Sequence, residues 1–169
     1  MASGDGEVTI RVAAPADAPA LARFRWEFRR TLGSPIEDEP AFVDRCAPWM
    51  AVRLEPPGGW RCWLAESGHQ IVGHVWVQRF EKIPNPTAER EHHAYLSNLF
   101  VRPPWRGRGI GARLLDVALD WCRAASIDRV ILWPTERSRT LYERRGFAVR
   151  DDVMEAILDE TAGWTSSDR

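Results

Sequence analysis

The sequence lacks a long hydrophobic run and lacks an excess of charge of one sign. Its longest uncharged apolar run, IVGHVWV at residues 71–77, is far shorter than the roughly 20 apolar residues that cross a bilayer. The 23 Lys and Arg residues nearly balance the 24 Asp and Glu residues, which leaves a net charge of −1 at pH 7. A nucleic-acid-binding protein normally carries a basic excess. We therefore expect neither a membrane nor a nucleic acid as a partner.

Cysteine is also scarce. The three cysteines, Cys46, Cys62 and Cys122, are widely spaced and fit neither a disulfide framework nor a zinc site. The first ten residues, MASGDGEVTI, contain neither the basic segment nor the apolar segment of a secretory signal. Both features favour a cytoplasmic protein with reduced thiols and no bound metal.

The 169 residues are enough for one domain with a full core. We expect a flexible leader at residues 1–7, a single domain at 8–160 and a loose tail at 161–169. Hydrophobic periodicity predicts helices at 13–30, 41–54, 110–125 and 135–145, with Gly146 as a left-handed cap of the last helix. It predicts strands at 8–12, 61–67, 70–80, 94–101 and 129–133, with one or two more at 147–158.

This order predicts a mixed α/β (α+β) fold, with a mainly antiparallel sheet of six or seven strands and helices on both faces. Residues 94–101, a helix and residues 129–133 form a βαβ unit, so these two strands should be parallel. The second of them, RVILW, is continuously apolar, which is typical of a strand buried on both faces.

The most unusual segment is RPPWRGRGIGARLL, residues 102–115, where a strand gives way to a helix. A helix N-terminus exposes unpaired N–H groups and the positive end of the helix dipole. Three glycines allow an anion to approach those groups closely, and Arg106 and Arg108 add positive charge. The segment therefore predicts a phosphate site, most naturally for a pyrophosphate.

Three phosphate-binding patterns compete for this segment. No Lys-Ser or Lys-Thr follows the glycines, so the segment is not a P-loop. The glycines read G-R-G-I-G, which does not fit the G-x-G-x-x-G spacing of a dinucleotide site. The third pattern, R-x-x-G-x-G after a strand and Val101-Arg102-Pro103, matches.

On this motif and a second one, the chain resembles the GNAT superfamily of N-acetyltransferases. RGRGIG, from Arg106 to Gly111, is similar to the family's acetyl-CoA signature, [Q/R]-x-x-G-x-[G/A]. LYERRGF, from Leu141 to Phe147, is similar to a second family signature, L/F-Y-x-x-x-G-F. The two occur in the family's order and at about its spacing, and the order of elements along the whole chain also matches.

The resemblance implies that the parallel strands splay apart and that the pantetheine arm of acetyl-CoA inserts between them. Backbone groups of Leu99, Phe100 and Val101 would then bind pantetheine, as sheet edges can. The pyrophosphate would lie on backbone N–H groups of a run of residues that comprises Arg106, Gly107, Arg108, Gly109, Ile110, Gly111 and Ala112.

The resemblance also implies a role for Tyr142 as the general acid that protonates the departing CoA thiolate. The alternative to this catalytic role is that Tyr142 is an aromatic residue that only packs against its neighbours on a helix. Ser138 and Tyr142 are expected to border the cofactor. The family often has Asn seven residues before this tyrosine and Ala four before it, whereas this chain has Thr135 and Ser138. Thr135 suits a helix cap instead.

The sequence leaves the general base open. Glu27 lies on the first helix, and Glu81, His92 and His93 flank the central strands, but each also fits a solvated surface residue. Asn98 either orients an acceptor or a water, or pins a bulge. Cys62 and Cys122 fall at core positions, so we expect direct attack on acetyl-CoA in a ternary complex rather than a thiol intermediate.

The amine acceptor, a small molecule or a peptide, is not named by the sequence. Five tryptophans precede the glycine segment, and most should fill the core, while one or two suit an acceptor groove. The acidic segment IEDE, residues 36–39, either attracts a positively charged amine or is a solvent-exposed connection between two helices. A domain that only binds acyl-CoA, as a sensor or scaffold, is the alternative to an enzyme. A homodimer is also left open.

Overall fold

The computed structural model describes residues 6–33 and 37–159. The chain divides into two compact units, Met1–Leu132 and Trp133–Arg169, and each is described by itself. The predicted tail at 161–169 and most of the predicted leader lie outside the described residues.

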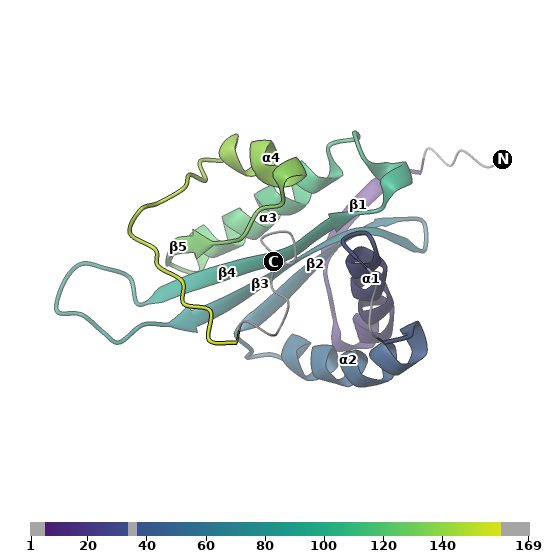
Figure 1. The fold of residues 1–169 in the computed structure, drawn as a ribbon, viewed down its shortest axis with the longest axis horizontal. Helices are drawn as coiled ribbons and strands as arrows, with labels where there is room; N and C mark the ends of the chain where they lie inside the picture. Colours follow the sequence, from purple (N-terminus) through teal and green to yellow (C-terminus); the bar gives the residue numbers. More distant parts are fainter. Residues whose placement is uncertain (1–5, 34–36, 160–169) are drawn as a thin grey trace. The chain divides into compact units, whose positions relative to one another are not determined.

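The first unit is built on a five-stranded sheet in the order β1-β2-β3-β4-β5 (Figure 1). Neighbouring strands from β1 to β4 are antiparallel, and β4 and β5 are parallel. The helix between the two parallel strands makes this the predicted βαβ unit. The strands are β1 (Val8–Val12), β2 (Trp60–Ser67), β3 (Gln70–Glu81), β4 (His92–Val101) and β5 (Ile127–Ile131).

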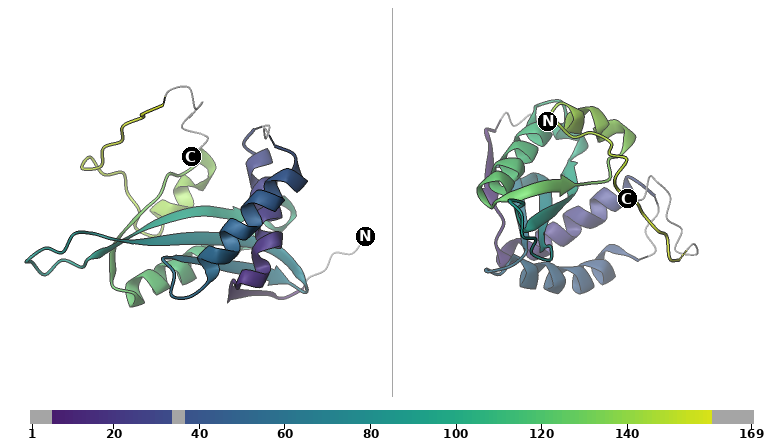
Figure 2. Two further views of the ribbon diagram at one scale, coloured as in Figure 1. Left: turned by 90° about the horizontal axis from the view of Figure 1, so that it is seen from below. Right: turned by 90° about the vertical axis from the view of Figure 1, so that its left-hand side faces the viewer.

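Helices cover both faces of this sheet, as predicted (Figure 2). Successive side chains of a strand point to opposite faces. On β3, a Cβ at Gly73 would meet Leu114 of α3 (Ile110–Ala124), while the next side chain, His74, packs its ring on Phe24 of α1 (Ala18–Arg30). α2 (Glu39–Leu54) packs beside α1. The apolar stripes of these helices bury against the sheet and form the core.

The prediction of a doubly buried strand at 129–133 was wrong. β5 runs from Ile127 to Ile131, and only Ile127 is buried, while Asp128 and Arg129 are exposed. Among the described residues β5 pairs only with β4, so it is an edge strand. Edge strands tolerate charged side chains because one side of the strand faces water.

The predicted strand or strands at 147–158 are absent from the described residues, so the sheet has five strands rather than six or seven. The second unit contains a 3-10 turn at Glu136–Ser138 and a short helix, α4 (Arg139–Glu143). After Gly146, which has the predicted left-handed φ of +85°, the chain turns at Asp151 and Asp152. Two adjacent aspartates favour a turn and interrupt the apolar alternation that a strand needs.

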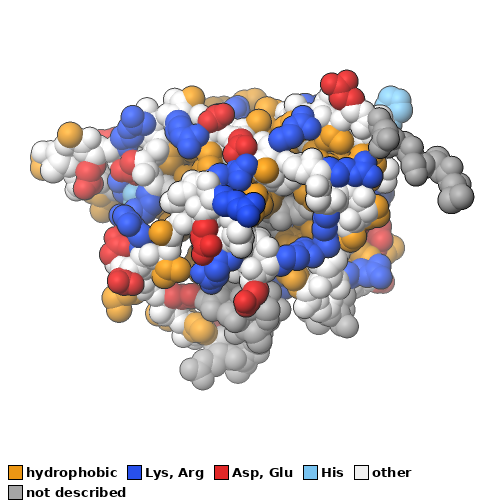
Figure 3. Space-filling view, turned by 90° about the horizontal axis from the view of Figure 1, so that it is seen from above, with side chains coloured by type: hydrophobic (Ala, Val, Ile, Leu, Met, Phe, Trp, Pro, Cys, Tyr) orange, Lys and Arg blue, Asp and Glu red, His pale blue; other side chains and the backbone are white. Residues whose placement is uncertain are grey.

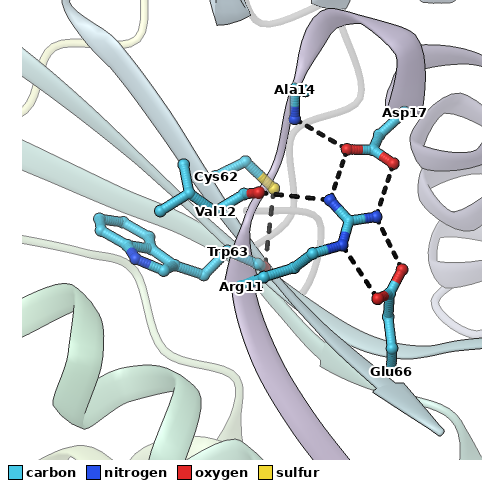
Figure 4. A network of polar contacts seen from close by, with 7 residues as sticks. All are labelled: Arg11, Val12, Ala14, Asp17, Cys62, Trp63 and Glu66. Atoms are coloured by element: carbon cyan, nitrogen blue, oxygen red, sulfur yellow. Dashed lines mark hydrogen bonds and ion pairs between the residues drawn. The ribbon is translucent and has the colours of Figure 1, made fainter.

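Arg11 ties the first strand to its surroundings (Figure 4). Its guanidinium donates to both oxygens of Asp17 at 2.8 Å and to both oxygens of Glu66 on β2 at 2.7 and 2.9 Å. Asp17 also accepts the backbone N–H of Ala14 at 2.7 Å. The network holds β1, the turn before α1 and β2 together. No helix of the described residues is long and apolar enough to cross a membrane.

Candidate active site

The glycine loop, residues 106–111, follows β4 and the 3-10 turn at Pro103–Trp105, and it includes the first two residues of α3. Gly107 and Gly109 have φ values of +76° and +74°, a left-handed conformation that side chains disfavour. A Cβ built at either position would meet no atom within 4 Å. Glycine is therefore required here by the backbone conformation, and the space above the loop is open.

The N-terminus of α3 is uncapped by side chains. Its N-cap residue is Gly109, which has no side chain to offer, and its first turn contains no acidic residue. The first N–H groups of a helix have no partner within the helix, and they carry the positive end of its dipole. The end of a 15-residue helix beside an open glycine loop therefore fits an anion such as a pyrophosphate.

The two arginines of the loop have different surroundings. The Nε of Arg106 donates to the carbonyl oxygen of Val101 at 2.9 Å, and its guanidinium lies over the ring of Phe100 at 5.6 Å. Arg106 thus fastens the loop to the end of β4. Arg108 is exposed and lies over the ring of Trp105 at 4.9 Å. Of the two, Arg108 is the one whose charge is placed at the loop surface.

Within the described residues, no strand pairs with the β5 side of β4 beyond Tyr95, and we call this stretch of β4 its open edge. Its pairing with β5 runs from His92 to Tyr95, whose partner Ile131 is the last residue of β5. The splayed strand pair that the resemblance implies stays a prediction. Because Arg102 donates its N–H to Val72 on β3 at 2.9 Å, the alternation of a strand turns the backbone of Val101 away from β3. By the same alternation, the backbone groups of Leu99 also point away from β3, whereas those of Phe100 point toward β3. The geometry favours Leu99 and Val101 over Phe100 as pantetheine contacts.

A bulge marks the middle of this edge. Asn98 and Leu99 together face Val75, where the register of β3 and β4 shifts, and Asn98 has a φ of +54°. Its Oδ1 accepts a hydrogen bond from Nη1 of Arg25 on α1, and its Nδ2 donates to the hydroxyl of Ser97 at 3.3 Å. Of the two roles that the sequence left open for Asn98, the structure shows the bulge.

Glu27, one base candidate, is held in an ion pair at the loop end of β4. Nε and Nη2 of Arg102 donate to its carboxylate at 2.9–3.1 Å, and Nη1 of Arg102 donates to the carbonyl oxygen of Ile71 at 2.9 Å. Both oxygens of the Glu27 carboxylate are therefore already engaged by a side chain of the protein. The geometry favours a structural role for Glu27.

Glu81, His92 and His93, the other base candidates, lie at the opposite end of β4 from the glycine loop. Glu81 is largely exposed and lies 3.7 Å from Nε2 of His92. Nε2 of His93 lies 3.2 Å from Asp128, which also accepts from Lys82 at 3.1 Å. Partial burial and then the charge of Lys82 lower the pKa of His93. None of these candidates is part of the open edge at 97–101.

The second unit contains Tyr142 on α4. Tyr142 is buried, and its ring meets Phe147 edge-on at 5.5 Å. Thr135 is the N-cap residue of the 3-10 turn, as predicted, but its hydroxyl lies 2.9 Å from that of Ser138 and makes no capping bond to a backbone N–H. The roles of Tyr142 and Ser138 at the cofactor stay predictions.

The thiols are poor nucleophiles in this structure. Cys62 and Cys122 are buried, as predicted, and burial raises the pKa of the Cys62 thiol well above its usual value and that of Cys122 to about 11. Only the thiolate attacks carbonyl carbon efficiently. Burial thus opposes a thiol intermediate at either position.

The acidic segment at 36–39 has partners of its own. Ile36 lies outside the described residues. Glu37 pairs with Arg45, Asp38 accepts the N–H of Ala41 at 2.9 Å as the cap of α2, and Glu39 lies 3.9 Å from Arg23. These contacts favour the solvated connection over a lure for a cationic amine.

Most of the tryptophans ahead of the loop are not fully buried. Trp63 and Trp76 are core residues, whereas 41% of Trp49 is exposed. Two of these indoles carry an arginine of the chain on their faces, with Arg30 4.8 Å from Trp26 and Arg53 3.8 Å from Trp49.

The sequence did not single out Arg25 as a site residue. Its position among Leu21, Phe24 and Phe28, on one apolar face of the helix, was the available signal.

Comparison with known proteins agrees with this geometry. A family model described as Acetyltransferase (GNAT) family matches residues 21–147. A probable N-acetyltransferase of Mycobacterium tuberculosis is 30% identical over 151 residues, which cover 84% of this chain and 80% of that protein.

Solved structures share the architecture. A predicted acetyltransferase with acetyl-CoA from Clostridium acetobutylicum superposes with a TM-score of 0.78 at 22% identity, over 90% of this chain and 97% of that one. A GCN5-related N-acetyltransferase from Ralstonia eutropha gives a TM-score of 0.75 at 25% identity, over 90% and 100%. The family model and the mycobacterial relative show that the chain belongs to the GNAT family of acetyltransferases.

Proposed function

We propose that this acetyltransferase moves the acetyl group of acetyl-CoA to a primary amine of a small molecule or peptide, by direct attack in a ternary complex in the cytoplasm. The observation that carries the proposal is the open glycine loop at the N-terminus of α3, next to the unpaired edge of β4. The similar structure from Clostridium acetobutylicum, which was solved with acetyl-CoA, supports the choice of cofactor.

Two parts of the first unit would hold the cofactor. Backbone N–H groups from Arg106 to Ala112 would bind the pyrophosphate, and Arg108 would add a screened charge at the surface. Leu99 and Val101 would pair with the pantetheine arm along the open edge of β4, as an added strand does. This arrangement would direct the thioester toward the bulge at Asn98.

The chemistry joins an amine to the acetyl carbonyl. The neutral amine attacks the thioester carbon, the C–S bond breaks, the nitrogen loses a proton and the CoA sulfur gains one. Tyr142 would supply the proton to the sulfur, because a phenol is a good donor at neutral pH. The raised thiol pKa values of Cys62 and Cys122 support a route without an acetyl-cysteine.

Substitution of Tyr142 with phenylalanine tests this assignment. We expect Tyr142→Phe to lower turnover by at least about tenfold, since general acid catalysis contributes on that order or more, with little change in acetyl-CoA affinity. CoA thiol release with acetyl-CoA and a panel of amines measures the first quantity, and calorimetric titration measures the second. Unchanged turnover across the pH range would rule out the role.

The same amine panel separates an enzyme from a CoA sensor. Release of CoA with at least one amine, at a rate that depends on the amine concentration, supports the proposal. Thermal stabilisation by acetyl-CoA without release for any amine favours the non-catalytic alternative.

A further inference from the structure

Arg25 on α1 is a partly buried cation that has no carboxylate partner among the described residues. Its one hydrogen-bond acceptor there is Oδ1 of Asn98, and its guanidinium also lies 5.7 Å from the ring centre of Phe28. Buried arginines are normally paired with an anion, because an uncompensated charge in a protein interior is costly. Burial is the main reason that the pKa of Arg25 falls to about 10.

Every titratable group found to act on Arg25 in this part of the structure is neutral or positive. Burial raises the pKa of Cys46 and of Tyr95, so both are neutral at pH 7, and Arg29 on the next turn of α1 adds a second positive charge. His74 is fully buried, and its pKa falls to about 3, chiefly through burial, so its ring is neutral too. Among the residues that the structure describes, the charge of Arg25 therefore has no compensating negative charge.

Several other arginines of the first unit are compensated. Arg11 binds Asp17 and Glu66, Arg102 binds Glu27, and Arg45 binds Glu37. Arg25 differs from these three in that its hydrogen-bond acceptor is the neutral amide of Asn98.

The position of Arg25 connects it to the proposed reaction. Asn98, which it binds, forms the bulge on the edge of β4 that β5 leaves open beyond Tyr95. The Arg25 side chain is only partly buried, so part of it remains accessible. A guanidinium presents a planar fork of donors that fits a carboxylate with two parallel hydrogen bonds. An acceptor whose amine lies at the thioester would thus bring a neighbouring carboxylate near Arg25.

We infer that Arg25, positioned by Asn98, binds a carboxylate of the acceptor, so the acceptor is a small amine that carries a carboxylate close to its amino group. This inference rests on the proposed N-acetyltransferase function and names the substrate class of the same site. The features that would instead bind a purely cationic acceptor are already occupied by the chain. The acidic residues at 37–39 have partners of their own, and the faces of two indoles carry arginines.

Matched pairs of α-amino acids and their primary amides test the inference. The amino group of the amide is the weaker base, so its intrinsic reactivity at neutral pH is the greater, and a preference for the acid must come from the protein. We expect wild type to favour the acid of its best pair by at least about tenfold in kcat/KM, as a charge-assisted hydrogen bond implies. Arg25→Gln should abolish this preference, and Arg25→Lys should retain part of it.

The matched control is Arg23→Gln, which removes an exposed arginine from the same helix and should leave the preference intact. Equal rates for acid and amide in wild type would overturn the inference. So would an equal loss for both substrates in Arg25→Gln with acetyl-CoA affinity unchanged, because that result indicates a purely structural role.

If no amine is acetylated, the proposed function fails, and calorimetric binding of the same acids and amides to the CoA-loaded protein then decides the inference. Binding of an acid that is lost in Arg25→Gln supports it, and no binding, or equal binding of acid and amide, overturns it.

Discussion

Arg102 and Glu27 show how a single contact changes the interpretation of a charged residue. Three N–H···O contacts join the guanidinium to the carboxylate, and the third nitrogen of Arg102 reaches the backbone of Ile71. The pair therefore links α1 to the end of β4, immediately before the glycine loop. The structure favours a role for Glu27, a candidate base in the sequence, as a support for the end of β4 before the glycine loop.

Substitution of Glu27 with glutamine separates the two roles. We expect Glu27→Gln to destabilise the fold by about 0.5 kcal/mol, because the pair is partly exposed and such pairs contribute little. The acid limb of the kcat/KM pH profile should remain where it is in wild type. Urea unfolding and a pH series measure the two effects, and loss of that limb with unchanged stability would restore Glu27 as the base.

At the scale of the element, the network around Arg11 joins β1, the turn before α1 and β2. Its hydrogen bonds lower the pKa of Asp17, whose ionised form is therefore favoured in the folded protein. A lowered folded pKa stabilises the fold above the unfolded pKa of about 3.9, and this contribution is lost as the pH falls through the folded value. The network is thus an acid-sensitive connection between sequence-distant strands.

The variant Asp17→Asn tests this connection. We expect it to lower the free energy of unfolding by about 1 kcal/mol at neutral pH, a modest value because 42% of the Arg11 side chain is exposed. The difference from wild type should shrink as the pH falls below about 4. Asp44→Asn, at an exposed site on α2, provides the control in the same denaturation series. A difference that stays constant down to low pH would contradict the account.

The elements that could be predicted from the sequence are those whose pattern reports local geometry. The alternation in β1, the stripe of α3 and the left-handed Gly146 depend on neighbours along the chain, and the structure confirms them. The pattern of RVILW could not reveal that β5 lies at an edge, because that depends on which strand lies beside it. For the same reason, the apolar residues after Gly146 did not establish a strand.

The candidate site follows the same division. The glycine loop was predictable, because positive φ values and an uncapped helix require glycine at fixed positions. The ion pair of Glu27 and the environment of Arg25 could not be predicted, because each depends on residues far apart in the sequence. Glu27 and Arg102, for example, are 75 positions apart. A charge within an apolar helix face was the only local signal for Arg25.

At the scale of the whole molecule, charge is balanced and binding depends on local geometry. On the face shown in Figure 3, Lys and Arg side chains are interspersed with Asp and Glu, in line with the net charge of −1. A mixed surface gives little long-range attraction for an anionic cofactor. We therefore expect backbone N–H groups of the glycine loop to supply most of the CoA affinity, and the solvent-screened charge of Arg108 to supply only a small part of it.

Calorimetric titration of CoA into wild type, Gly109→Val and Arg108→Ala measures how the CoA affinity divides between the loop backbone and Arg108. Valine at 109 places a side chain in the open space and disfavours the left-handed backbone, so it should weaken CoA binding more than Arg108→Ala does. The loss of CoA affinity in Arg108→Ala, relative to wild type, should also become smaller as the salt concentration rises. Gly68→Val is the matched control, because Gly68 has a φ of +59° with equally open space but lies in the turn between β2 and β3. We expect a larger rise in the Kd for CoA in Gly109→Val than in Arg108→Ala, and no change in Gly68→Val. A larger rise in Arg108→Ala than in Gly109→Val would show that side-chain charge, and not the loop backbone, dominates CoA binding.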